Sequence, residues 1–209
     1  KRLLTSSVWE VVLRLEGQIE PWAPGQFARL HVGDNAWRDY SIAGLEDNHL
    51  RLLISTRTGG QGSRFIEHAG TGTRTVVELP LGEFGLADSG RRRLFIATGT
   101  GIAPMLAMFA QAPGLEHDTL LFGCRYRYED LTTKIGSPMP GRVVRCLSRE
   151  EVPDTFHGRV TDALAQFAGD PDLDPHSTDV YLCGSAAMVA DTRSLLERAG
   201  YASVFTEPY

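Results

Sequence analysis

Residues Ala97–Pro104 read A-T-G-T-G-I-A-P and continue from the apolar run Leu94–Ala97. A strand, a glycine-rich turn and a helix in this order aim backbone N–H groups and a positive helix end at a phosphate. A side chain at Gly99 or Gly101 would stand between the backbone and a pyrophosphate. Because the stretch is shorter than the full G-x-G-x-x-G fingerprint, a plain structural turn is the alternative interpretation. The candidate phosphate-binding residues are Thr98, Gly99, Thr100 and Gly101.

Composition limits the class of protein. The 209 residues leave room for two modest domains, and a hydrophobic content of 42% is ordinary for a globular protein. The net charge of −5 argues against nucleic acid as the main partner. The chain has no signal peptide and no apolar run near the roughly 20 residues of a membrane span, so we expect a cytoplasmic protein. We also expect a monomer. The widely spaced Cys124, Cys146 and Cys183 predict neither a disulfide framework nor a metal site.

The first ninety residues carry short β-type runs separated by glycine and proline. The expected strands are Val8–Leu15, Phe27–Val32, Tyr40–Ala43, Leu50–Ser55 and Thr75–Leu79. One short helix is expected at Ser63–Ala69. Closely spaced strands with a single helix predict an antiparallel β-barrel over residues 1–90. The segment Asp88–Arg93, D-S-G-R-R-R, is the expected linker, although its three arginines could also form a basic docking patch.

After the linker the pattern changes to strands that alternate with helices. The expected strands are Leu94–Ala97, Thr119–Gly123, Arg142–Leu147 and Val180–Cys183. The expected helices are Ala103–Gln111, Arg159–Phe167 and Ala186–Ala199. This alternation predicts a doubly wound parallel sheet, with helices on both faces, over residues 91–209. Ligands of such sheets bind at the carboxyl ends of the strands. The predicted fold class is therefore all-β plus α/β.

The run Arg38–Ala43, R-D-Y-S-I-A, has the residue types that hold a flavin. Arg38 and Tyr40 are two positions apart in a strand, so both project from one face. An arginine suits a phosphate, and an aromatic ring suits the flavin ring or ribose. Ser41 could offer its hydroxyl to flavin N5. The alternative is an edge strand with an exposed arginine.

A second glycine-rich stretch, Gly59-Gly60-Gln61-Gly62-Ser63, leads into the expected short helix. Glycines before a helix N-terminus make an anion site, and Gly62 and Ser63 are its candidate residues. The alternative is a flexible loop capped by Ser63. Two phosphate-suited loops, one in each predicted domain, suggest two phosphorylated cofactors.

Taken together, these motifs resemble those of the ferredoxin–NADP(H) reductase family over nearly the whole chain. The matching stretches are Pro24–Phe27 (P-G-Q-F), Arg38–Ser41 (R-x-Y-S), Gly62-Ser63, Gly99–Pro104 (G-T-G-I-A-P), Cys183-Gly184 and the terminal Glu207-Pro208-Tyr209. The ending is similar to that of plastid-type members. The order and spacing of these short motifs make the resemblance specific.

The resemblance implies a flavin-binding barrel and an NADP-binding α/β domain. Hydride would pass between NADPH and FAD, with FMN less favoured, and single electrons would pass to a ferredoxin or flavodoxin. It implies that Ser41 contacts flavin N5, that Cys183 and Glu207 line the nicotinamide pocket, and that Tyr209 covers the flavin face. Ile54 is also predicted to contact a bound cofactor. Alternatively, Cys183 is a small buried strand residue and Tyr209 a frayed end.

Three arginines bear on the choice of coenzyme. NADP sites offer arginine to the 2′-phosphate, whereas NAD sites place an acid on the ribose hydroxyl. Arg125 follows an expected strand, with no acid until Glu129, and Arg149 and Arg159 follow later elements. The sequence stretches around these three arginines resemble those of the bacterial subclass of the family. They favour NADPH over NADH as the coenzyme. The alternative is that each arginine is an ordinary solvated residue.

The sequence also departs from the family pattern. Gly136, Pro138 and Pro140 interrupt the helix usual before Arg142, and no long hairpin is present to pack the FAD adenine. A second hypothesis is therefore an NADH-dependent reductase component of an oxygenase. This chain has no cysteine cluster for an iron–sulfur centre, so the electron acceptor would be another protein or a small molecule. A third is a regulatory module without turnover, against which Ser41, Cys183 and Glu207 argue.

Overall fold

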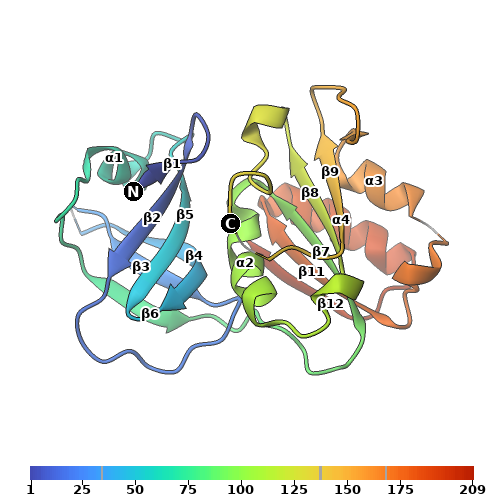
Figure 1. Cartoon of the computed structure of the whole chain (residues 1–209), viewed down its shortest axis with the longest axis horizontal. Coiled ribbons are helices and arrows are strands. Elements are labelled where there is room, and N and C mark those ends of the chain that lie inside the picture. Colours follow the sequence, from blue (N-terminus) through green and yellow to red (C-terminus); the bar gives the residue numbers. More distant parts are fainter. Residues whose placement is uncertain (34, 137, 168) are drawn as a thin grey trace. The chain divides into compact units, whose positions relative to one another are not determined.

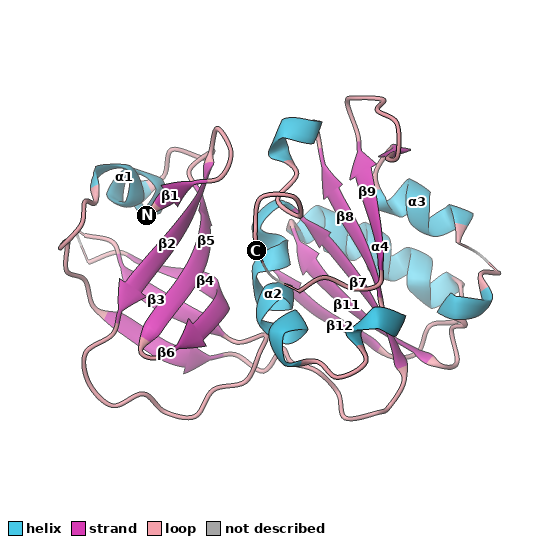
Figure 2. Cartoon of the chain, viewed as in Figure 1, coloured by secondary structure: helices cyan, strands magenta, loops and turns pink. Residues whose placement is uncertain are grey.

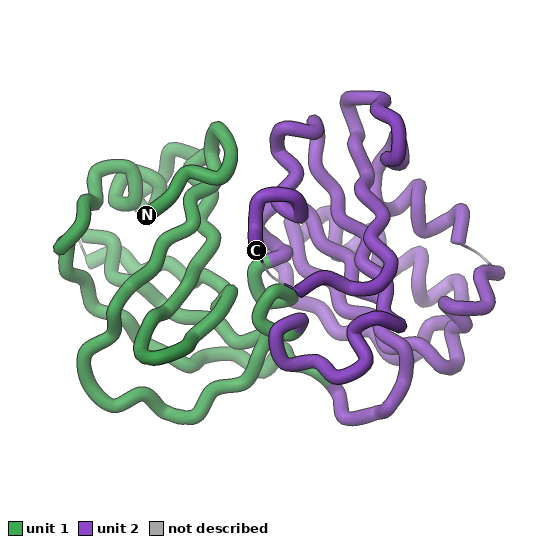
Figure 3. Tube along the Cα trace, viewed as in Figure 1, with its two compact units in different colours: residues 1–86, 103–108 green, residues 87–102, 109–209 purple. Residues whose placement is uncertain are grey.

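The computed structural model describes residues 1–33, 35–136, 138–167 and 169–209. The chain divides into two compact units, one of residues 1–86 and 103–108 and the other of residues 87–102 and 109–209 (Figure 3). The predicted division at residues 90 and 91 into a flavin-binding and an NAD(P)-binding domain stays a prediction.

The first unit is built on a six-stranded sheet in the order β1-β2-β5-β4-β3-β6, with every pair antiparallel (Figure 1). Its strands are β1 (Arg2–Leu3), β2 (Val8–Arg14), β3 (Phe27–His31), β4 (Trp37–Glu46), β5 (His49–Ser55) and β6 (Val77–Leu81). Helix α1 spans Gln61–His68. Strand β6 starts two residues later than predicted from Thr75, and β1 was not predicted.

The antiparallel sheet is curved around its own core. The β3–β6 ladder shifts register between Phe27 and Arg29, and the β4–β5 ladder between Ile42 and Gly44. Such bulges bend a strand and increase its twist. The enclosed side chains include Leu30, Ile42 and Leu50, which are 0% exposed, and α1 adds Ile66. The predicted barrel with a single helix is confirmed.

The second unit is built on a six-stranded parallel sheet in the order β10-β9-β8-β7-β11-β12 (Figure 2). Its strands are β7 (Arg92–Thr98), β8 (Thr119–Cys124), β9 (Arg142–Leu147), β10 (Phe156–His157), β11 (Thr178–Gly184) and β12 (Val204–Pro208). Its helices are α3 (Val160–Gln166) and α4 (Ala186–Arg198), and it also contains the two ends of α2 (Ile102–Gln111), whose residues 103–108 belong to the first unit. A 3-10 turn, η1 (Gly99–Gly101), joins β7 to α2. Strands β10 and β12 were not predicted.

Helices cover both faces of the parallel sheet. Successive side chains of β7 point to opposite faces, so Leu94 and Ile96 join the core formed with α3 and α4. Phe95 points the other way, where its ring meets Phe109 of α2 edge-on at 4.9 Å between centroids. Tyr181 of β11 stacks on Phe95 on this second face. The predicted doubly wound arrangement is confirmed.

The predicted linker is wrong in its last two residues, because β7 already begins at Arg92. Its three arginines are each paired with an aspartate of the same unit. The pairs are Arg91–Asp179 at 3.5 Å, Arg92–Asp172 at 2.6 Å and Arg93–Asp118 at 2.7 Å. Burial of Asp118 raises the pKa of its carboxyl despite Arg93. These arginines therefore do not form a free basic patch, although Arg91 and Arg92 remain exposed to solvent.

Candidate active site

The parallel sheet changes direction between β7 and β11. From β7 the chain continues to β8 and β9 on one side, whereas β11 is followed by β12 on the other. Loops that leave two neighbouring strands in opposite directions open a crevice at their carboxyl ends, where ligands of such sheets bind. The residues at these two ends are Thr98 and Gly184. The predicted phosphate loop therefore lies at the position that the topology favours.

Close packing explains the glycines of this loop. A Cβ on Gly101 would collide with the carbonyl oxygen of Cys183 and lie 2.9 Å from the backbone nitrogen of Gly184. Backbone atoms inside a sheet cannot move aside, so only glycine fits there. Gly99 has a φ of +53°, which lies in the left-handed region. Sequence reasoning assigned both glycines to a pyrophosphate, and the structure adds packing between loop and strand as a reason for Gly101.

Cys183 lies in β11 and is 1% exposed. It is the register partner of Glu207 in the neighbouring strand β12, so two predicted nicotinamide-pocket residues lie side by side. Burial, helped by the charge of Glu207, raises the pKa of the Cys183 thiol to about 12. Cys183 is therefore a neutral thiol at physiological pH. At this position Cys183 can be a buried strand residue and can also line a nicotinamide pocket, so its two interpretations are compatible.

Tyr209 is held at the same edge of the sheet. Its backbone N–H donates to the Gly184 carbonyl at 3.0 Å, and its hydroxyl donates to the Thr98 carbonyl at 2.9 Å. The residue as a whole is 61% exposed, whereas its hydroxyl end is crowded by the chain, and this burial raises the pKa of the phenol. The alternative of a frayed end is wrong. The run Val204–Thr206 before it is rich in β-forming side chains, and this was the missed signal for β12.

The three predicted coenzyme arginines follow neighbouring strands. Arg125 comes after β8 and Arg149 after β9, and the N–H of Arg149 donates to the Arg125 carbonyl at 3.0 Å. Arg159 follows β10, whose end is attached to β9 through the hydrogen bond from Gly158 N–H to the Leu147 carbonyl. Each is exposed, and none of the three guanidinium groups has a partner among the described residues. The carboxyl edge thus offers three cationic side chains.

Two carboxylates lie at the same edge, which the sequence did not suggest. Glu129 Oε2 accepts a hydrogen bond from the N–H of Arg125 at 3.1 Å. Glu150 Oε2 accepts one from the N–H of Arg127 at 2.6 Å. Glu129, the first acid after Arg125 in the sequence, reaches back to it because a short 3-10 turn, η3 (Arg127–Glu129), reverses the chain. The edge is therefore mixed in charge.

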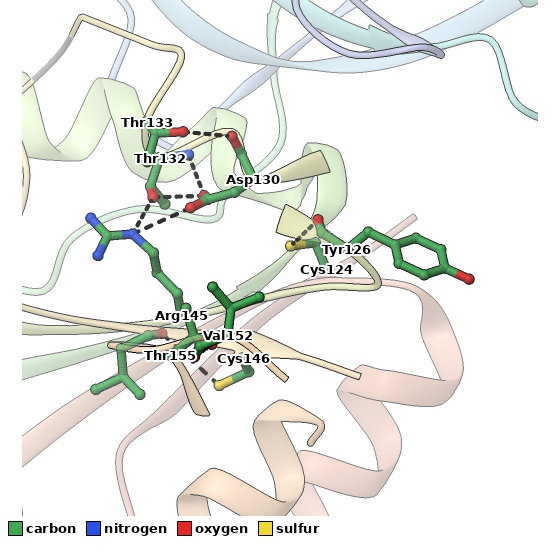
Figure 4. Close-up of polar contacts among 10 residues, drawn as sticks. Cys124, Tyr126, Asp130, Thr132, Thr133, Arg145, Cys146, Val152 and Thr155 are labelled. Atoms are coloured by element: carbon green, nitrogen blue, oxygen red, sulfur yellow. Dashed lines mark hydrogen bonds and ion pairs between the residues drawn. The ribbon is translucent and has the colours of Figure 1, made fainter. Parts of the chain in front are cut away.

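A buried polar network anchors the connection from β8 to β9 (Figure 4). The Asp130 carboxylate accepts from the N–H and hydroxyl of Thr132 at 2.9 and 2.7 Å, and lies 3.3 Å from Arg145 Nε. The described residues 130–136 and 138–141 contain no α-helix, as the prolines and glycine there predicted. The network therefore ties the segment after β8 to Arg145 of β9.

In the first unit the structure brings the two predicted flavin motifs together. A Cβ on Gly62 would collide with the Tyr40 hydroxyl and lie 3.3 Å from Arg38 Cγ. Arg38 donates to Gln61 Oε1 at 3.1 Å and is exposed. Tyr40 is half-buried, and burial raises the pKa of its phenol. The start of α1 therefore packs directly on the face of β4 that carries Arg38 and Tyr40.

Three other predicted residues occupy different surroundings. Ser63 is 4% exposed, with its hydroxyl 3.3 Å from that of Thr58, and no side chain caps α1 at Gly60. Ser63 as a helix cap is therefore wrong. Ser41 points to the opposite face of β4 from Arg38 and Tyr40. Ile54 is 1% exposed within the barrel core, so its side chain is closed to a cofactor.

Comparison with known proteins agrees with this geometry. The family model described as an oxidoreductase NAD-binding domain matches residues 95–194. The ferredoxin–NAD(+) reductase component of the alkene monooxygenase system of Xanthobacter autotrophicus is 34% identical over 206 residues, covering 91% of this chain and 61% of that protein. A cytochrome P450 reductase of Amycolatopsis has a TM-score of 0.83 at 25% identity, covering 99% of this chain and 66% of its own. Over most of its length this chain is similar to reductase components of electron-transfer systems, and residues 95–194 match the oxidoreductase NAD-binding domain family.

The reductase fold extends over the whole of this chain. The ferredoxin NADP+ reductase of Neisseria gonorrhoeae, solved with bound FAD and NADP, has a TM-score of 0.79 at 22% identity, covering 97% of this chain and 92% of its own. The chain spans 61% of the length of its Xanthobacter relative. None of the described helices combines the length and apolar character that crossing a membrane requires. The likeness of the last three residues to plastid-type members stays a prediction.

Proposed function

We propose that the chain is a flavin-dependent reductase that takes hydride from NADPH onto FAD and passes single electrons to a ferredoxin or flavodoxin. The observation that carries the proposal is the meeting of Thr98–Gly101, Cys183 and Tyr209 at the carboxyl ends of β7 and β11. A glycine-rich turn there, with a buried thiol and an aromatic ring beside it, suits a nicotinamide dinucleotide.

The residues of the first unit fit a flavin. Gly62 lets the start of α1 pack directly against the side chains of Arg38 and Tyr40, where a Cβ would collide with the Tyr40 hydroxyl. The α1 N-terminus carries no acidic residue in its first turn and no side-chain cap, so its N–H groups are suited to phosphate oxygens. Arg38 adds a charge-assisted donor at the same place. A bound flavin would supply the change between two-electron and one-electron transfer.

Roles follow for the residues around the reacting atoms. Ser41 would donate its hydroxyl to flavin N5, and the Cys183 thiol would pack against the nicotinamide as a neutral group. Glu207, beside Cys183, would hold the carboxamide end of the coenzyme. Tyr209 would act as a gate, because its ring lies next to Gly99 at the edge where the nicotinamide would enter.

A preference for NADPH would rest on Arg125, Arg149 and Arg159, which are exposed at one edge without protein partners in the described part of the chain. Charge-assisted hydrogen bonds are worth about 1.5–3 kcal/mol each, so Arg125→Ala or Arg149→Ala should lower kcat/KM for NADPH about tenfold or more. NADH lacks the 2′-phosphate, so its kcat/KM should hardly change. Arg127→Ala is the matched control, since it removes the same charge from the same turn.

A second candidate is an NADH-dependent reductase component of an oxygenase. The carboxylates of Glu129 and Glu150 favour it, because an acid at this edge suits a free ribose hydroxyl and repels a 2′-phosphate. The name of the Xanthobacter relative, a reductase for NAD(+) in a monooxygenase system, points the same way. Under this alternative, Glu129→Gln should lower kcat/KM for NADH and raise it for NADPH.

The test begins with the visible absorption spectrum of the purified chain. A yellow protein that NADPH bleaches without oxygen, more efficiently than NADH does, supports the leading proposal. Bleaching that is more efficient with NADH selects the second candidate. A colourless chain that also fails to take up added FAD or FMN would refute both.

A further inference from the structure

Residues 82–91 join the two units outside any helix or strand. The chain first passes from one unit to the other within this segment, at 86/87. Its later passages, at 102/103 and 108/109, lie within helix α2, which both units share. A helix is stiff, whereas an irregular segment bends at the residues that nothing holds. The freedom of the connection therefore depends on how much of residues 82–91 is anchored.

The start of the segment is anchored in the first unit. The Gly82 carbonyl accepts from Gln26 Nε2 at 2.9 Å. Phe84 is 7% exposed, and a Cβ on Gly25 would collide with its carbonyl oxygen. Residues 82–84 are therefore held against the turn that precedes β3.

The end of the segment is bound to β11 of the second unit. The N–H of Ala87 donates to the Tyr181 hydroxyl at 3.0 Å. The Ser89 hydroxyl donates to Asp179 Oδ2 and accepts from the N–H of Arg91 at 3.1 Å. Asp179 Oδ1 lies 3.5 Å from Arg91 Nη1. These contacts of Ala87, Ser89 and Arg91 with β11 are called the linker latch below.

Both partners on β11 are buried. Tyr181 is 0% exposed, and its ring stacks between Phe95 and Phe205 at centroid distances of 5.2 and 5.0 Å. Packing on both faces of the ring holds the hydroxyl that Ala87 reaches at a fixed place.

Asp179 gives the latch its strength. Its side chain is 1% exposed, and a buried carboxylate is costly unless it is paired. Its register partner Arg93 directs its guanidinium to Asp118 and to the Pro113 carbonyl instead. Among the described residues, the Asp179 carboxylate therefore depends on Ser89 and Arg91, and opening the latch would leave it buried without them.

We propose that the linker latch is a positioning device for hydride transfer, an inference that rests on the proposed function. With the latch closed, three residue steps separate Phe84 from Ala87, which span at most about 11 Å. With it open, eight steps separate Phe84 from Arg92 at the start of β7, or about 29 Å. The coenzyme and the flavin are assigned to different units, and their reacting atoms must approach to about 3–3.5 Å. Ser89 and Asp179 therefore keep the connection short enough for that approach.

The first experiment measures amide hydrogen exchange by mass spectrometry on the full chain as purified. The N–H groups of Ala87 and Arg91 should exchange slowly in the wild type. They should exchange roughly tenfold faster in Ser89→Ala, the usual range for loss of a hydrogen bond to a charged group. Ser89→Thr keeps the hydroxyl and should match the wild type. Ser177→Ala is the matched control, because Ser177 also donates to an aspartate, Asp174 Oδ2 at 2.9 Å, immediately before β11.

The second experiment follows flavin bleaching by the preferred coenzyme without oxygen, in a stopped-flow instrument. Ser89→Ala should lower the limiting rate about tenfold or more, because small misplacements of reacting atoms are costly. The Kd of the coenzyme should stay within about twofold, since the latch lies at the amino end of β11, away from the carboxyl edge. Two glycines inserted after Gly85 lengthen the span without touching the latch and should lower the limiting rate similarly. Ser89→Thr and Ser177→Ala should leave it unchanged.

The outcomes separate this inference from the function on which it rests. Equal exchange at Ala87 and Arg91 in the wild type and in Ser89→Ala would overturn the latch. An unchanged limiting rate in both Ser89→Ala and the insertion variant would overturn its positioning role. A Kd that rises in step with the loss of rate would assign Ser89 to the fold alone and overturn that role too. A wild-type chain that binds no flavin would remove the proposed function, and the role in hydride transfer with it.

Discussion

The buried pair of Asp130 and Arg145 allows a sharp test of how the turn after β8 is held (Figure 4). The Asp130 side chain is 3% exposed and that of Arg145 35%, so the ion pair is largely shielded from water. Asp130→Asn keeps the size and an acceptor oxygen for Thr132 but removes the charge. Hydrogen bonds to charged groups contribute about 1.5–3 kcal/mol, so we expect Asp130→Asn to lower the free energy of unfolding by about that amount.

The reciprocal variant, Arg145→Met, should cost a similar free energy because it leaves the buried carboxylate of Asp130 without its cation. The double variant should lose about 1–2 kcal/mol less than the sum of the two single losses. Urea unfolding followed by far-UV circular dichroism measures all four proteins. The matched control is Asp172→Asn, whose side chain is 59% exposed and whose partner Arg92 is 47% exposed. An exposed pair of this kind should lose less than about 1 kcal/mol. A coupling energy between Asp130 and Arg145 near zero would refute the anchoring role.

Three further predictions concern the proposed sites. Arg38→Ala should yield a protein with little bound flavin, because the pyrophosphate loses a charge-assisted partner, and full flavin occupancy would contradict the assignment of the flavin to the barrel. Tyr209→Ser should tighten binding of oxidised coenzyme and relax discrimination against NADH, since the ring no longer has to leave Gly99 and Thr98. Unchanged affinity in a coenzyme titration would argue against a gate. Burial raises the pKa of Cys124, Cys146 and Cys183 to about 12 from 9.0, so iodoacetamide at pH 8 should label them on the order of a thousandfold more slowly than in the urea-unfolded chain. Rapid labelling of Cys146 or Cys183 in the native protein, seen by mass spectrometry, would show that these two thiols are not buried.

The sequence by itself determined the architecture, because the signals involved are local. The glycine turn G-T-G at Gly99–Gly101 follows an apolar run and precedes a helical pattern in adjacent residues. The structure has β7, η1 and α2 at these positions. The strand ends that carry Arg125 and Arg149 were also predictable, since each arginine directly follows an apolar run. Periodicity and turn residues report on the neighbouring chain, and these features need nothing more.

Only the tertiary structure decided which side chains meet. Arg91 looked like part of a solvated linker, yet its partner Asp179 lies far along the chain on β11. Glu129 looked too distant from Arg125 to matter, until a turn folded its carboxylate back. Tyr209 looked like a loose end and is held by two hydrogen bonds to carbonyls. Each contact depends on strand register and loop path, which a pattern along one chain does not encode. A residue's position in the sequence identifies its neighbours along the chain, but it does not identify the distant residues that folding brings into contact with it.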